Sequence, residues 1–133
     1  MGKSLIQVAN QSPQTVAAGG IISLGSTQRR YGCNLRLSGN GIEVNGEGYY
    51  TADLSVSVAP TAAGAVTVAL FSDGVQIPGA IAYGTATAGD NTNLSVNCTV
   101  RQGCCCDSAD NLTAVLIEGA GEVNNVSLRV VKA

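Results

Sequence analysis

Residues 49–58 read YYTADLSVSV, and this stretch decides the fold class. Its apolar positions start at Tyr50, end at Val58 and alternate with more polar ones. Because successive side chains of a β-strand point to opposite sides, the alternation predicts a strand with one apolar face and one polar face. The same period of two returns in residues 94–100 and 126–130, whereas the spacing of an amphipathic helix is nowhere sustained. We therefore predict an all-β chain.

Turn residues separate the expected strands at short intervals. Ser72-Asp73-Gly74 is typical of a tight hairpin, because Asp-Gly readily adopts the positive φ that such turns need. Pro78-Gly79 is expected to interrupt the returning strand, since proline cannot donate to a central ladder. The runs that read as strands lie near residues 4–8, 14–17, 21–24, 34–37, 42–44, 49–58, 65–71, 75–83, 92–101, 112–118 and 123–131. About ten short strands predict a two-sheet antiparallel jelly-roll sandwich. A length of 133 residues fits one domain, 1–133.

One run breaks the alternation. Residues 112–117 (LTAVLI) are almost uniformly apolar, which is typical of a strand that is buried on both faces. A two-sheet sandwich covers only one face of such a strand, so the other face needs cover from elsewhere. Either a second copy of the chain supplies it, or the first forty residues do. In the first case the expected contact residues are Phe71, Tyr83, Leu112, Ala114 and Leu116, and Leu116→Asp is expected to abolish assembly because it buries an unpaired charge.

The first forty residues differ in composition from the rest. They are rich in glutamine and carry the basic pair Arg29-Arg30 before Tyr31. We expect residues 1–40 to form either outer strands of the same sandwich or a segment that docks on another molecule. Arg29-Arg30 is interpreted as a solvated turn or as a partner for acidic side chains of a neighbour.

The charge balance excludes several classes of protein. The chain has seven Lys and Arg against nine Asp and Glu, and only 12% of its residues are charged, against about 25% in typical soluble domains. So few charges favour a repeated subunit contact. A mildly acidic chain lacks the basic stripe of a nucleic-acid binder. No apolar run approaches the roughly 20 residues of a membrane span, and no secretory signal is visible.

Three groups of residues resemble a known family. Gly48-Tyr49-Tyr50 opens the long alternating strand, residues 66–79 read VTVALFSDGVQIPG, and residues 126–131 form a closing strand. In this order, these groups resemble the C1q/TNF-like trimeric jelly rolls of the bacterial and bacteriophage type. That type includes the C-terminal domain of collagen-like spore-surface glycoproteins. The resemblance covers roughly two-thirds of the chain, from Gly46 onward.

The resemblance implies a function in a particle. The chain is similar to small stand-alone proteins encoded beside capsid genes of bacteriophages and prophages. It therefore implies a non-enzymatic homotrimer that decorates a capsid or forms a head fibre, is assembled in the bacterial cytoplasm and is carried in the virion. The expected partners are copies of the chain itself, capsid or other virion proteins, and a host-surface glycan. A spore-coat or surface component remains an alternative, although the Gly-X-Y repeats of a collagen-like stalk are absent.

The five cysteines leave three interpretations open. They are Cys33, Cys98 and the consecutive Cys104, Cys105 and Cys106. In the first, Cys98 is a small buried apolar residue and the other thiols stay reduced. In the second, Cys33 and the triplet form disulfides, either within the chain or between subunits. In the third, Cys104 and Cys106 bind a metal ion, to which other subunits of a trimer add ligands, although the usual zinc-ligand spacing is absent and Asp107 is the only adjacent acid.

The sequence predicts no catalytic residue and no cofactor. The chain has no His, which removes the Ser-His-acid relay, and its carboxylates fall in turns or on polar strand faces. The alternative to a structural role is a carbohydrate-binding or adhesive trimer, with loops 60–64, 84–92 and 101–110 as its binding site. A sugar site usually needs an aromatic platform, for which Tyr31, Tyr49 and Tyr83 are the candidates.

Overall fold

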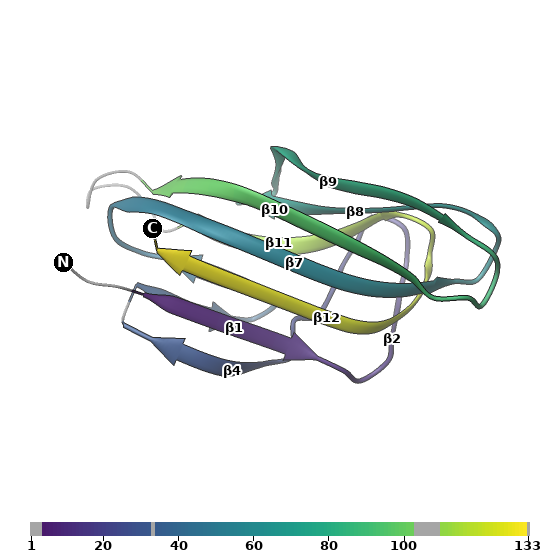
Figure 1. Ribbon diagram of the computed structural model, residues 1–133, viewed down its shortest axis with the longest axis horizontal. Coiled ribbons are helices and arrows are strands. Elements are labelled where there is room, and N and C mark those ends of the chain that lie inside the picture. Colours follow the sequence, from purple (N-terminus) through teal and green to yellow (C-terminus); the bar gives the residue numbers. More distant parts are fainter. Residues whose placement is uncertain (1–3, 33, 103–109, 133) are drawn as a thin grey trace.

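The computed structural model describes residues 4–32, 34–102 and 110–132, and it is a two-layer β-sandwich (Figure 1). The strands of these segments are β1 (Leu5–Asn10), β2 (Gln14–Val16), β3 (Gly20–Ile21), β4 (Ser26–Tyr31), β5 (Leu35–Ser38), β6 (Gly41–Val44), β7 (Gly48–Pro60), β8 (Gly64–Ser72), β9 (Val75–Ala86), β10 (Thr92–Gln102), β11 (Asp110–Glu118) and β12 (Gly121–Lys132). The predicted all-β jelly-roll sandwich is confirmed.

The strands form two antiparallel sheets. One sheet, called the β7 sheet below, has the order β10-β7-β12-β1-β4, with β2 beside one end of β12. The other, called the β11 sheet, has the order β5-β6-β11-β8-β9, with β3 beside β11. From β6 onward, each strand lies in the other sheet from the strand before it, except in the β8–β9 hairpin, as expected of a jelly roll.

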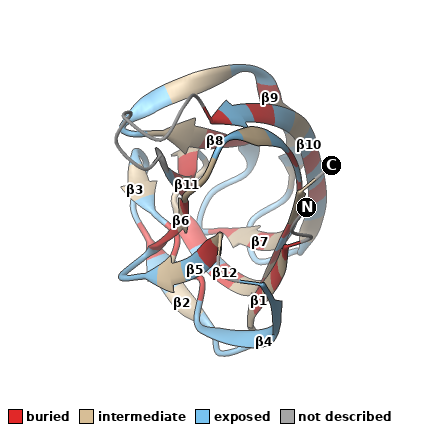
Figure 2. Cartoon of the chain, turned by 90° about the vertical axis from the view of Figure 1, so that its left-hand side faces the viewer, coloured by how far each residue is buried: buried red, intermediate tan, exposed pale blue. Residues whose placement is uncertain are grey.

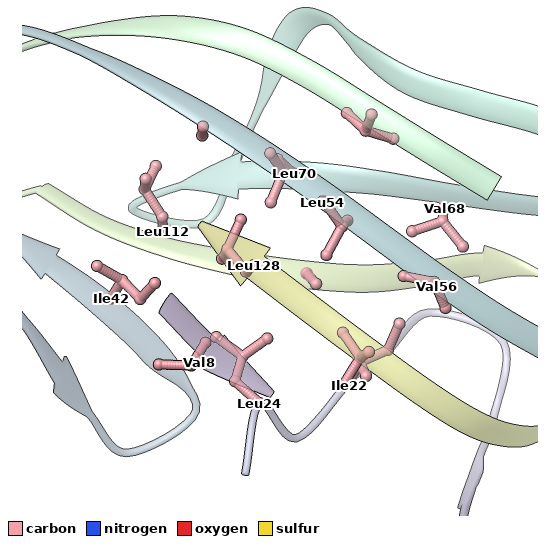
Figure 3. Close-up of a cluster of buried hydrophobic side chains, with 14 of the residues drawn as sticks. Val8, Ile22, Leu24, Ile42, Leu54, Val56, Val68, Leu70, Leu112 and Leu128 are labelled. Carbon is pink, nitrogen blue, oxygen red and sulfur yellow. The ribbon is translucent and has the colours of Figure 1, made fainter. Parts of the chain in front are cut away.

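The core lies between the two sheets and follows the predicted alternation. In β7, every second side chain from Tyr50 to Val58 is buried, and the intervening ones face outward. Figure 3 shows Leu54 and Leu128 of the β7 sheet near Leu70 and Leu112 of the β11 sheet. All four are at most 2% exposed. Burial of this shared apolar face is the main favourable contribution to folding.

The predicted hairpin is confirmed in detail. Asp73 has φ 52° and Gly74 has φ 82°, the pair of positive values that a tight hairpin between β8 and β9 requires. The Asp73 side chain then joins the turn to the start of β11, where its Oδ1 accepts a hydrogen bond from the Asn111 amide at 3.0 Å. The Asp73 amide donates in return to the Asn111 carbonyl oxygen.

The expected interruption at Pro78-Gly79 is confirmed for the ladder to β8, in which residues 77–80 have no partner. β9 continues from Val75 to Ala86 and takes up the extra residues as an irregularity opposite Ala69 and Phe71 of β8, with Gly79 at φ 84°. A proline is tolerated there because β9 is the last strand of its sheet, so the missing donor breaks no inner ladder.

The first forty residues belong to the sandwich. They supply β1 between β12 and β4, and they also supply β2, β3 and β5. Of the two alternatives for residues 1–40, the described part of this region takes the form of strands of the same sandwich. Strand β4, which no expected strand covered, contains Arg29-Arg30, so the interpretation of this pair as a turn is also wrong.

The two long edges of the sandwich differ. At one edge β9 and β10 lie close together, since a methyl group on Gly84 would come within 2.9 Å of a Leu94 methyl carbon. At the other edge β4 is the last strand of its sheet, and all six of its residues are exposed (Figure 2). The link that the structure describes from β4 to the opposite sheet is a hydrogen bond of 2.7 Å from Arg30 Nε to the Leu35 carbonyl oxygen.

The two ends of the chain lie at the same end of the sandwich (Figure 1). β1 and β12 are antiparallel neighbours, so the residue that starts β1, Leu5, is opposite Val131. The Lys132 amide donates to the Ser4 carbonyl oxygen at 2.9 Å. Both termini therefore leave the fold side by side.

Candidate functional site

Three of the predicted contact residues lie inside the single chain. Leu112, Ala114 and Leu116 of β11 point into the core and are 0% exposed. A side chain with no exposed surface in one subunit has none to lose to another. Their assignment to a subunit interface is therefore wrong, because β7 and β12 of the same chain already cover this face of β11.

The outward face of β11 is covered only in part. Val115 points outward and is 7% exposed, beside the 51% exposed Ile21 of β3. Hydrogen bonds from the Gly19 amide to Leu116 and from the Ile22 amide to Ala114 attach this part of the chain to β11. The N-terminal region thus lies alongside β11 within the sheet, where Ile21 is the neighbour of Val115.

Phe71 and Tyr83 lie on the outward face of the β11 sheet. Phe71 is half-buried opposite Thr113, whereas Tyr83 is 73% exposed opposite Thr67. The outward row next to them runs across four strands and consists of Ile21, Val115, Ala69 and Ile81. A role of Phe71 and Tyr83 in a subunit contact stays a prediction.

The outward face of the β7 sheet is built mainly from small polar side chains. One row across four strands consists of Ser95, Ser55, Ser127 and Ala9. The next row consists of Asn97, Asp53, Arg129 and Gln7, with an ion pair of 3.2 Å between Asp53 Oδ2 and an Arg129 guanidinium nitrogen. These rows line a shallow depression of about 380 Å³. The two rows carry no net charge, because Asp53 and Arg129 form an ion pair, and the serine and alanine side chains lose little rotamer entropy on contact.

The predicted ligand residues do not come together. Tyr49 on β7 and Tyr31 on β4 face outward on the same sheet but are separated by β12 and β1, and Tyr83 lies on the other sheet. The loops also lie at opposite ends of the sandwich. Residues 61–63 and 87–91 lie at the Pro60 end of β7, whereas the third loop starts after Gln102, which pairs with Gly48 at the other end. Residues 103–109 of the third loop lie outside the described residues. No observation therefore favours an aromatic sugar platform.

A polar cluster that the sequence did not predict fixes the start of β7. The Tyr50 hydroxyl donates toward the carbonyl oxygens of Asn45 and Gly46, at 2.8 and 2.9 Å. The side-chain Nδ2 of Asn34 donates to the Asn45 carbonyl oxygen, and the Oδ1 of the same side chain accepts from the Ser4 hydroxyl. Burial raises the pKa of Tyr50. The motif Gly48-Tyr49-Tyr50 was the available signal, and the cluster explains why its second tyrosine is buried.

The carboxylates with described partners serve local structure. The hydrogen bond from Asn45, together with the Arg36 guanidinium at 3.2 Å, holds the pKa of Glu43 below its usual value. Glu118 accepts a hydrogen bond from the Thr67 hydroxyl. Within the described segments, no three His, Cys, Asp or Glu residues are grouped as metal ligands, and no helix there has the length and apolarity to cross a membrane.

One of the five cysteines is described. Cys98 carries a free thiol on the inward side of β10, half-buried against the core. Burial and the nearby Asp53 carboxylate raise the pKa of this thiol, so it is a poor nucleophile. Cys33, Cys104, Cys105, Cys106 and Asp107 lie outside the described residues, and their disulfides or metal binding stay predictions.

Sequence comparison gives no relative, because no family model and no curated protein matches the chain. Structure comparison does. Murine APRIL superposes with a TM-score of 0.76 at 11% identity over 99% of this chain and 100% of its own. The globular domain of the zebrafish complement 1qA protein gives 0.70 at 9% identity over 94% of each chain. The fold is C1q/TNF-like.

A third solved structure extends this C1q/TNF-like set. The PRD1 vertex protein P5 superposes with a TM-score of 0.62 at 14% identity, over 97% of this chain and 96% of that one. At such low identities the likeness concerns the fold. The predicted C1q/TNF-like jelly roll is thereby confirmed, including the N-terminal strands that the resemblance in sequence did not cover.

Proposed function

We propose that the chain is a non-enzymatic structural homotrimer of a bacteriophage or prophage particle, of the capsid-decoration or head-fibre type. The observation that carries the proposal is the C1q/TNF-like fold over nearly the whole chain, shared with a protein described as a vertex protein. The resemblance in sequence adds the trimeric habit and the virion. The low content of charged residues adds sheet faces that a second copy can cover with little repulsion.

The β7 sheet offers the better surface for a second copy. Its rows of serine and alanine let another sheet approach closely, and Asp53 and Arg129 neutralise each other on that face. Leu5 and Val131 add half-buried apolar surface beside these rows. A closed trimer uses two different surfaces of each subunit, so this polar face meets another surface of the neighbouring copy. Hydrogen bonds across that contact replace those to water, while the apolar end supplies burial.

Light scattering of the purified chain tests the trimer. We expect the mass of three chains at micromolar concentration, and a monomer that stays folded at that concentration would contradict the proposal. Ser55→Arg places a long charged side chain in the centre of the β7 sheet face and should shift the protein toward monomer, with an unchanged circular dichroism spectrum.

Tyr83→Lys is the matched variant on the other sheet, where sequence analysis placed the contact. It should leave the trimer intact. Loss of the trimer with Tyr83→Lys but not with Ser55→Arg would move the contact to the β11 sheet. The location is tested separately by mass spectrometry of purified particles, in which the chain should be present in stoichiometric amount with the capsid proteins.

A further inference from the structure

The edge of strand β4 has the features of a site for an added strand. β4 is the last strand of the β7 sheet and pairs with β1 alone among the strands of the described segments. All six of its residues, from Ser26 to Tyr31, are exposed, on the inward as well as the outward side. An unpaired edge presents backbone donors and acceptors that another extended chain can use.

Two guanidinium groups stand on this edge. In the part of the chain that the structure describes, neither Arg29 nor Arg30 forms an ion pair, whereas Arg36 pairs with Glu43 and Arg129 with Asp53. Arg30 donates to the Leu35 carbonyl oxygen, and Arg29 reaches only the carbonyl oxygen of its own neighbour, Gln28. Arg29 is therefore available to a carboxylate from outside, and its planar group suits paired hydrogen bonds to one.

The surroundings add no negative charge that would satisfy these groups. Arg29 lies opposite Gln7 of β1, and Gln7 lies opposite Arg129 of β12. Strands β1 and β4 contain no Asp or Glu, although the whole chain has a net charge of −2. The edge is thus locally basic on an acidic protein.

We propose that β4 binds an extended acidic segment of another protein as an added β-strand, with a carboxylate of that segment on Arg29. Alternate acidic residues of such a segment fall on one face of the added strand, on the same side as Arg29. This inference does not depend on the trimer or on the virion.

The competing explanation is that Arg29 and Arg30 protect the edge. Charged residues on edge strands commonly prevent pairing with other chains. That explanation predicts no affinity for any extended peptide, and it predicts that removal of the charges promotes aggregation. The two explanations therefore give opposite results in a binding experiment.

Fluorescence anisotropy with a labelled eight-residue peptide of alternating glutamate and valine provides the test. We expect saturable binding that weakens with added salt. Arg29→Gln should weaken it by up to about fivefold, the upper limit for one exposed ion pair. Arg101→Gln on β10, at the opposite edge of the same sheet, is the matched control and should leave the affinity unchanged.

Two further peptides separate strand addition from simple charge attraction. A peptide with a central proline should lose binding because it interrupts the ladder, and one with glutamine for glutamate should bind several-fold more weakly. Hydrogen exchange of amides 26–31 should slow only with the binding peptide. No binding of the acidic peptide, equal binding of the proline peptide, or equal losses from Arg29→Gln and Arg101→Gln would each overturn the proposal.

Discussion

Tyr50 shows how one side chain connects three parts of the chain. Its ring is fully buried at the start of β7, and its hydroxyl holds the carbonyl oxygens of the turn at Asn45 and Gly46. Asn34 reaches the same turn from the segment before β5. Deletion of a buried hydroxyl with two acceptors costs more stability than the net free energy of its hydrogen bonds. The reason is that the two carbonyl groups are left without a partner.

Tyr50→Phe should lower the free energy of unfolding by about 1 kcal/mol. The folded pKa of Tyr50 lies above the ordinary value of 10.0, so the folded chain holds this proton more tightly than the unfolded chain. Its contribution to stability is complete below pH 10 and is lost as the pH rises through the raised pKa.

Urea unfolding between pH 9 and pH 11 measures this effect. The wild-type chain should lose stability over that interval more steeply than Tyr50→Phe. Tyr49→Phe, at the exposed neighbouring position, serves as the control and should follow the wild type. Equal slopes for the wild type and Tyr50→Phe would show that the hydroxyl does not titrate with folding.

At the scale of elements, β11 shows why a uniformly apolar strand misled the sequence analysis. Its inward residues meet the core, while on its outward side Val115 is covered by neighbours in the same sheet, among them Ile21 of β3. The pattern of residues 112–117 correctly indicated burial on both faces. It left open whether a second copy or the first forty residues provide that burial, because such contacts join residues far apart in sequence.

Leu116→Asp should therefore unfold the single chain and not merely its assembly. An unpaired carboxylate in the core costs roughly 3–5 kcal/mol, a large part of the stability of a domain. Thr113→Asp, at a half-buried outward position of the same strand, should cost less than about 1 kcal/mol. Thermal unfolding followed by circular dichroism measures both. A folded monomer of Leu116→Asp would contradict this prediction and support the subunit contact predicted from the sequence.

Other elements were predictable because their signals are local. The Asp73-Gly74 hairpin and the alternation of β7 need only neighbouring residues and fixed backbone preferences. Strand β4 was missed because it has no buried face and hence no alternation to read. The polar face of the β7 sheet was missed for a similar reason, since Ser95, Ser55 and Ser127 become neighbours only when three strands pair.

At the scale of the whole molecule, the two sheets present different surfaces to partners. The β7 sheet offers small polar rows, and the β11 sheet offers an apolar row with Tyr83 beside it. Sequence analysis found the apolar positions and assigned the contact to them. Which face a copy covers depends on the size and charge of side chains over several strands, and these properties arise from the register and not from any single run of residues.

Because the two ends of the chain are neighbours, they can be joined and the chain reopened at another turn without a change of fold. Ser4 and Lys132 are joined by a hydrogen bond, so a short glycine-serine linker between them needs to cross little distance. A circular permutant that opens at the exposed Gly39-Asn40 turn should fold with a melting temperature within several degrees of the parent. One that opens at Asp73-Gly74 should melt much lower, since that turn is hydrogen-bonded to Asn111. Peptides fused to either terminus would accordingly extend from the same end of the sandwich and leave its opposite end uncovered.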